Sequence, residues 1–291
     1  MKRLEQVYNT IDSFLTNVIS SSVSIVKILL QSDFSHKKNL PKGGKECIIL
    51  GNGPSLADSL AEYASILRQY QLIAVNSFAL TKEYELLKPD YYVMHDPGLW
   101  ISENELSSKI YKAITEKTNW PLTLLFPVQA KKSNAIRDLE SEKVKIIFYN
   151  YTIFKGFKNL KHYFFKKNLA MPQSQNVLVA CLFLALNMGT QTIYILGSDH
   201  TWHENISVND QNILCVKDVH YYDEGVEINL RPFKKGLHLD ETFKVSEIFE
   251  AWTKVFKGYE TINEYAETLN AKVYNASKIS FIDAFERRRL S

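Results

Sequence analysis

The sequence predicts an α/β fold: a Rossmann-like, mainly parallel sheet with helices on both faces, a lid-like insertion and an N-terminal helix. Short apolar runs alternate along the chain with segments whose apolar residues recur at helical spacing. Such alternation favours parallel strands joined by right-handed crossovers. The first apolar run, residues 47–50, stops at the glycine turn G-N-G-P-S and leads directly into a helix-like segment. A strand, a glycine turn and a helix N-terminus together are typical of an anion site.

The N-terminal segment precedes the first expected strand. Its apolar residues recur at helical spacing over residues 1 to about 34, with Lys2, Arg3 and Lys27 on the polar face. Two interpretations stay open: an amphipathic helix on a membrane surface or a partner, or a helix packed on the protein's own core. The basic linker 35–45 follows, so we expect two parts, 1–45 and 46–291. No stretch is expected to be long enough to span a bilayer.

The remaining elements follow in order along the chain. Five further strands are expected over residues 72–75, 91–94, 122–126, 144–149 and 192–196. Residues 176–188 are apolar nearly all round and predict a central helix. The less regular stretch 203–243 predicts a lid or acceptor-binding insertion. After it we expect a helix over 241–266, a strand over 272–275 and a solvated basic terminus at 286–289.

The composition narrows the class of protein. The net charge of +3 over 291 residues is too small to indicate a nucleic-acid partner. Cys47, Cys181 and Cys215 lack metal-ligand spacing, and two of them lie in apolar runs. These cysteines fit a reducing compartment. We therefore expect a cytoplasmic protein, with peripheral contact to the inner membrane as an open alternative, and no metal or other cofactor.

Polar residues follow the ends of the expected strands and open the central helix. Because parallel strands end at one edge, these side chains are expected to meet there and bind a nucleotide. The expected nucleotide-binding residues are Asn52, Gly53, Ser55, Asn76, Ser77, Asp96, Ser174, Gln175, Asn176, Asp199, His200 and Tyr221. Individually, several are equally plausible as helix caps or turn residues.

Two resemblances to known families rest on motifs at these positions. The motifs G-N-G-P-S-L, V-N-S-F, H-D-P and N-V-L-V-A-C-L-F-L-A-L-N-M-G-T-Q-T-I-Y-I-L-G-S-D resemble bacterial sialyltransferases of the Campylobacter lipooligosaccharide type. The blocks K-P-D-Y-Y-V-M-H-D-P and G-S-D-H-T-W also resemble a related group from bacterial polysaccharide gene clusters. That group is similar to archaeal hydroxymethylpterin pyrophosphokinase.

The sialyltransferase resemblance implies a CMP-activated acid-sugar donor, catalysis without a metal and a homo-oligomer. It places Asn52, Gly53 and Ser55 at the donor phosphate and ribose. It places Asn76, Ser174 and Gln175 at the nucleotide, His238 near the general base, and His220-Tyr221 at a His-Tyr pair upstream. The chain departs from that family at Pro172, where the family has arginine, and at Thr201 and Trp202, near one phosphate-binding tyrosine.

These observations predict an inverting glycosyltransferase that moves an acid sugar, such as sialic acid or Kdo, to a surface glycan or glycolipid. A histidine suits the base, and we expect His238, with His220 and His200 as rivals. One alternative is a Mg²⁺-dependent pyrophosphokinase-like enzyme using Asp96 and Asp199. The other is a non-catalytic scaffold of polysaccharide assembly that docks through the N-terminal helix.

Overall fold

The protein is built on one eight-stranded sheet in which every neighbouring pair of strands is parallel. The computed structural model describes residues 2–36, 40–101, 104–217, 221, 229–236 and 240–290. The strand order is β11-β10-β6-β1-β2-β3-β4-β5. The strands are β1 (Glu46–Leu50), β2 (Gln71–Val75), β3 (Tyr91–Val93), β4 (Leu122–Pro127), β5 (Val144–Tyr149), β6 (Thr192–Leu196), β10 (Lys272–Asn275) and β11 (Glu286–Arg287). The α/β fold class is confirmed, and all seven expected strands are present.

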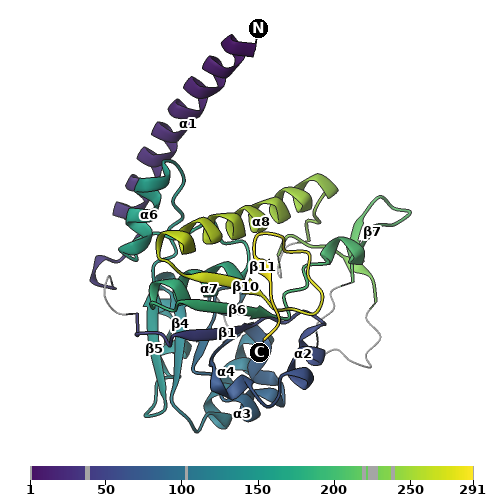
Figure 1. The fold of residues 1–291 in the computed structure, drawn as a ribbon. Coiled ribbons are helices and arrows are strands. Elements are labelled where there is room, and N and C mark those ends of the chain that lie inside the picture. Colours follow the sequence, from purple (N-terminus) through teal and green to yellow (C-terminus); the bar gives the residue numbers. More distant parts are fainter. Residues whose placement is uncertain are drawn as a thin grey trace.

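Helices cover both faces of this sheet, as expected. The α-helices are α1 (Lys2–Gln31), α2 (Leu56–Glu62), α3 (Glu83–Leu87), α4 (Glu105–Lys117), α5 (Asn134–Arg137), α6 (Lys158–Lys166), α7 (Val177–Asn187) and α8 (Val245–Thr268). The short 3-10 helices are η1 (Phe34–His36), η2 (Leu67–Gln69), η3 (Asn76–Leu80), η4 (Pro97–Leu99), η5 (Val128–Lys132) and η6 (Trp202–Asn205). Figure 1 shows α8 on one side of the sheet and α3 and α4 on the other.

The sheet has a separate apolar core on each of its two faces, because successive side chains along each strand point to opposite faces. In β1, Cys47 and Ile49 pack into the core that contains α6, α7 and α8, whereas Ile48 and Leu50 pack into the core of α2 to α5. Strands buried on both faces read as continuous apolar runs, which is why residues 47–50 show no polar alternation.

The central helix α7 lies between the sheet and α8. All of its residues from Leu178 to Leu186 are buried. Helix α8 approaches its N-terminal end closely, since a β-carbon added at Gly258 would lie 2.8 Å from the Gln173 carbonyl oxygen. This packing fixes the segment before α7 against the body of the protein.

The structure corrects one C-terminal expectation and adds detail to another. The stretch expected to be irregular contains a small antiparallel sheet of β7 (Ile206–Val208), β8 (Leu214–Val216) and β9 (Arg231–Pro232). The basic residues 286–289 are exposed, as expected, but the backbone of residues 286–287 pairs with β10, the Arg288 guanidinium lies 4.7 Å from the Tyr274 ring centre, and Arg289 lies 3.7 Å from Glu62. The backbone of this terminus is therefore held against the sheet while its charged side chains stay in solvent.

Helix α1 projects from the body of the protein, as Figure 1 shows. Its C-terminal part is anchored: Ser24 Oγ donates to the Lys155 carbonyl oxygen (3.0 Å) and the Phe157 N–H donates to Ser21 Oγ (3.0 Å). An 18-residue window within Glu5–Gln31 has a mean hydropathy of 1.6, so this helix is long and apolar enough to cross a membrane by length and composition. The expectation that no stretch reaches that length is therefore wrong.

Candidate functional site

The sheet topology brings four strand ends together at one edge. Strands β1 to β5 run in order across the sheet, whereas β6 lies on the other side of β1. The strand order therefore reverses between β1 and β6, and ligands of such sheets bind outside the carboxyl ends at this reversal. The neighbouring ends of β6, β1, β2 and β3 carry Asp199 and His200, Asn52 to Ser55, Asn76 and Ser77, and His95 and Asp96, respectively.

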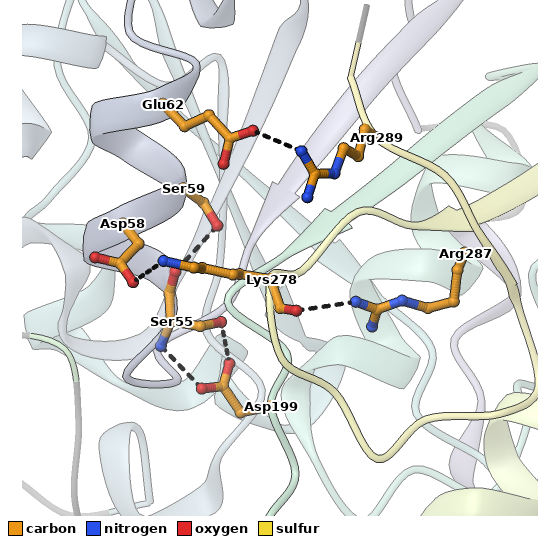
Figure 2. Close-up of polar contacts among 8 residues, drawn as sticks. All are labelled: Ser55, Asp58, Ser59, Glu62, Asp199, Lys278, Arg287 and Arg289. Atoms are coloured by element: carbon orange, nitrogen blue, oxygen red, sulfur yellow. Dashed lines mark hydrogen bonds and ion pairs between the residues drawn. The ribbon is translucent and has the colours of Figure 1, made fainter.

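Asp199 and Ser55 bind each other across the reversal point. Figure 2 shows the carboxylate of Asp199 accepting hydrogen bonds from the Ser55 N–H (2.8 Å) and from Ser55 Oγ (2.6 Å). Both residues are buried. Burial raises the pKa of the Asp199 carboxyl, while the two hydrogen bonds from Ser55 lower it.

The two glycine N–H groups of the turn after β1 are also hydrogen-bonded inside the protein. The Gly51 N–H donates to the Leu196 carbonyl oxygen and the Gly53 N–H to the Gly197 carbonyl oxygen, both at 2.8 Å. The sequence suggested that these N–H groups and the Ser55 hydroxyl are free for an anion. In the structure they already have partners inside the protein, so a ligand at this turn must use other atoms.

The glycines of this turn are explained by the contact between the two loops. A β-carbon at Gly51 would lie 2.4 Å from the Gly197 carbonyl oxygen, and one at Gly53 would lie 2.6 Å from Asp199 Oδ1. Such distances are far below van der Waals contact, so both positions exclude any side chain.

The segment before α7 ties β3 to β6. Ser174 Oγ lies 2.7 Å from His95 Nε2, and the Tyr149 hydroxyl lies 2.8 Å from His95 Nδ1. Two residues later, Asn176 Nδ2 lies 3.1 Å from His200 Nε2. Because β1 and β2 lie between β6 and β3, this segment runs beside the ends of all four strands.

The imidazole of His200 is held in a neutral state. Asn176 Nδ2 donates to the Tyr259 hydroxyl oxygen (2.8 Å), and that hydroxyl lies 2.7 Å from His200 Nε2. The arrangement is satisfied when Nε2 accepts from both neighbours and the proton sits on Nδ1. Burial lowers the pKa of His200 to about 3 and that of His95 to about 4. A histidine with such a pKa is a weak base at neutral pH, which argues against His200 as the general base.

Two amide oxygens remain without a partner at the ends of β1 and β2. Asn52 Oδ1 and Asn76 Oδ1 are buried and accept no hydrogen bond from the part of the chain that the structure describes. Asn76 has a φ of 48°, a left-handed conformation that asparagine tolerates better than most residues. The Tyr221 N–H donates to the Asn52 carbonyl oxygen (3.4 Å), so the insertion after β6 reaches this same edge.

The other expected residues vary in their position. Ser77 is buried in η3, Gln175 is exposed, and the exposed Asp96 accepts a hydrogen bond from the Gly98 N–H (2.9 Å). His220 and His238 lie outside the described residues, so their catalytic roles stay predictions.

Sequence reasoning missed a cavity of about 500 Å³ beyond the ends of β3 and β4. It is lined by the apolar Leu99, Trp100, Ile101, Tyr111 and Ala130 and by the polar Ser107, Gln129, Lys132, Ser133 and Asn134. The only signal in the sequence was the turn D-P-G at 96–98, which begins η4 on one wall.

A family comparison identifies the wider group of this protein. Residues 18–205, well over half of the chain, match the family described as 6-hydroxymethylpterin diphosphokinase MptE-like. The chain belongs to the MptE-like family. The matched range contains all four strand ends described above, from Asn52 to His200. This confirms the second resemblance, and the link to Campylobacter sialyltransferases stays a prediction.

Other comparisons bear on the fold of this MptE-like chain. No curated protein matches it significantly. Among solved structures, it is similar to the MAf glycosyltransferase from Magnetospirillum magneticum AMB-1, with a TM-score of 0.50 and 13% sequence identity. The match covers 90% of this chain but only 35% of that protein's chain. At this identity the likeness shows a shared fold.

A diphosphokinase reaction would use Mg²⁺, which prefers carboxylate ligands. Both carboxylate oxygens of Asp199 accept hydrogen bonds from Ser55, and Asp96 Oδ1 accepts one from Gly98. Within the described ranges, no group of three or more His, Cys, Asp or Glu side chains is arranged to hold a metal ion.

Proposed function

We propose that this MptE-like protein is a glycosyltransferase that moves an acid sugar from a CMP-activated donor to a glycan or glycolipid acceptor. The observation that carries the proposal is the pair of unpartnered oxygens, Asn52 Oδ1 and Asn76 Oδ1, at adjacent strand ends. Amide oxygens accept hydrogen bonds, so they suit ribose or sugar hydroxyls and the amino group of cytosine. An ionised phosphate has no hydrogen to donate to them.

The donor phosphate is better matched by α7. The N-terminus of this helix lies at the same edge, because its cap residue Asn176 contacts His200 after β6. Free N–H groups and the helix dipole at such an end favour one negative charge. A CMP-linked sugar carries a single phosphate, which one helix N-terminus suits better than it suits a triphosphate with its metal ion.

We assign the base to His238 and the acceptor to the cavity beyond β3 and β4. The acceptor hydroxyl loses its proton to the imidazole, its oxygen bonds to the sugar carbon, and the bond from that carbon to the CMP phosphate oxygen breaks. The buried aromatic residues and the Lys132 side chain on the cavity wall suit a sugar bearing a carboxylate. The likeness in fold to a glycosyltransferase supports this reaction class at the coarse level.

The family description favours a second candidate, a Mg²⁺-dependent diphosphokinase-like transferase. Thermal unfolding of the protein with CMP or ATP, each with and without Mg²⁺, separates the two. We expect CMP to raise the unfolding midpoint without metal. A rise seen only with ATP and Mg²⁺ would favour the second candidate, and no rise with either nucleotide would favour the non-catalytic scaffold.

Asn52→Ala gives a sharper test at single-residue level. The variant removes a buried oxygen that has no partner among the described residues, so the unliganded protein should keep its stability or gain slightly. The shift caused by CMP should nevertheless disappear. Asn9→Ala, on the exposed face of α1, is the matched control and should keep the full CMP shift. Equal CMP shifts in both variants would contradict the assigned role of Asn52.

The base is tested by activity. His238→Ala should abolish sugar transfer while CMP binding is retained, and His220→Ala should leave most of the turnover. Unchanged turnover in His238→Ala would exclude it as the base. Loss of turnover in His220→Ala alone would transfer the role to that residue.

A further inference from the structure

Helix α1 exposes a continuous apolar face that nothing in the described structure covers. Eleven of its large apolar side chains are between 39% and 79% exposed, in contrast to the buried core of the domain. They are Val7, Tyr8, Ile11, Phe14, Leu15, Val18, Ile19, Val23, Val26, Leu29 and Leu30. An exposed patch of this extent on a folded protein marks an interaction surface.

The spacing along this face is that of a coiled coil. Tyr8, Leu15, Ser22 and Leu29 recur every seven residues, and Ile11, Val18 and Ile25 recur between them, so the steps alternate between three and four. These are the a and d positions of a heptad pattern, and Ser22 is the single polar residue among them. A seam sustained over this many turns indicates pairing with another helix.

A different side of α1 holds the helix to its own domain. Ser21, Ser24 and Ile28 are buried there, and the Phe14 ring packs edge-on against Phe157 at 5.6 Å between centres. Only Ile25 of the seam is partly covered by the core. The domain therefore holds α1 in place and leaves the a/d seam open.

The anchoring also argues against α1 as a membrane span. A membrane-spanning helix needs about 20 consecutive, mainly apolar residues that lie in the bilayer and not against the protein's own domain. One side of the helix contacts the domain at intervals from Phe14 to Ser32, where Ser32 Oγ donates to the Leu169 carbonyl oxygen (2.7 Å). The part that projects beyond these contacts is shorter than a span and contains Glu5 and Asp12.

We propose that α1 pairs with α1 of a second copy of this chain through the a/d seam. The seam has no charged residue at an a or d position that would specify a different partner, and an apolar stripe of this kind is complementary to itself. The seam from Tyr8 to Leu29 provides about 33 Å of contact length at about 1.5 Å per residue, or about three heptads. The proposal is independent of the reaction that the domain catalyses.

The test compares the molar mass in solution of three full-length proteins. We expect the parent protein to be dimeric by size-exclusion chromatography with light scattering. Leu15→Glu places a charge in the seam and should weaken the dimer roughly a hundredfold or more. Thr16→Glu introduces the same charge on the polar side of α1 and should leave the dimer unchanged. Because Leu15 and Thr16 are exposed, both variants should retain the parent's thermal midpoint.

Three results would overturn the proposal. One is a parent protein that is monomeric at tens of micromolar. Another is a dimer that survives Leu15→Glu, which would place the interface elsewhere. The last is a monomer that sediments with phosphatidylethanolamine–phosphatidylglycerol vesicles and loses this binding in Leu15→Glu, which would make the face a membrane surface.

Discussion

The neutral imidazole of His200 makes the stability of this protein sensitive to mild acid. Nε2 lies 2.7 Å from the Tyr259 hydroxyl and 3.1 Å from Asn176 Nδ2, so a proton on Nε2 would oppose the amide N–H of Asn176 and force the hydroxyl to turn. The folded state therefore resists protonation, and burial holds the pKa of His200 at about 3. The unfolded chain binds the proton near the ordinary value of 6.5. The contribution of the neutral His200 to the free energy of unfolding is thus fully present above pH 6.5 and is lost as the pH falls from there toward 3.

The size of the loss follows from the same values. At pH 5 the solution is about 1.5 pH units below the pKa of the histidine in the unfolded chain, and each unit costs the folded state about 1.4 kcal/mol. His200 alone should then remove about 2 kcal/mol from the free energy of unfolding. His95, buried with a pKa of about 4, should remove a similar amount. Together these two losses are a large part of the free energy of unfolding of a typical folded domain, which is about 5–15 kcal/mol.

His200→Gln tests this reasoning by urea unfolding at pH 7 and pH 5. The glutamine oxygen can accept from the same two neighbours but does not titrate, so the variant should lose about 2 kcal/mol less than the parent between these pH values. Tyr259→Phe is the control: it removes the two hydrogen bonds of the hydroxyl, about 1 kcal/mol each at both pH values, and keeps the imidazole. If His200→Gln lost as much stability as the parent on acidification, the neutral-acceptor assignment would be wrong.

Two further predictions concern the turn after β1. Gly53→Ala should destabilise the protein by about 2 kcal/mol or more, because its β-carbon would lie 2.6 Å from Asp199 Oδ1. Gly44→Ala, whose β-carbon would meet neighbours at 3.5 Å, should change the unfolding midpoint little; equal effects would contradict the close-approach argument. Ser55→Ala should cost about 2 kcal/mol for one hydrogen bond to a buried carboxylate, measured by urea unfolding. In a double-mutant cycle with Asp199→Ala the two effects should be clearly non-additive, and simple additivity would show that the pair is not coupled.

The strands and α7 were predictable because each is a run of apolar residues that are neighbours in the sequence. Residues 144–149, 192–196 and 272–275 carry the apolar and aromatic residues of buried strands, and their bounds agree with β5, β6 and β10. The apolar run of α7 similarly required a position between two layers. Alternation of strands and helices then gave the parallel sheet and the common edge.

Which atoms at the carboxyl edge of the sheet are free for a ligand was not predictable, because their hydrogen bonds depend on residues far apart in the chain. Ser55 and Asp199 are separated by 144 positions, and nothing near Ser55 signals that its donors already have an acceptor. Similarly, β11 exists because β10 offers an unpaired edge, not because residues 286–287 favour a strand. The ends of β1 and β2 could be named from sequence, but which of their atoms stay without a partner required coordinates.

The position of β1 within the sheet has a consequence for how the chain matures during synthesis. Ile48 pairs with Leu72 on one side, but its neighbour on the other side is Tyr194, which is translated much later. Until β6 emerges, an almost wholly apolar strand presents an open row of backbone groups to solvent or to other nascent chains. Fragments that stop before residue 192 should therefore aggregate or recruit chaperones, and late pairing of β6 should set the pace of refolding.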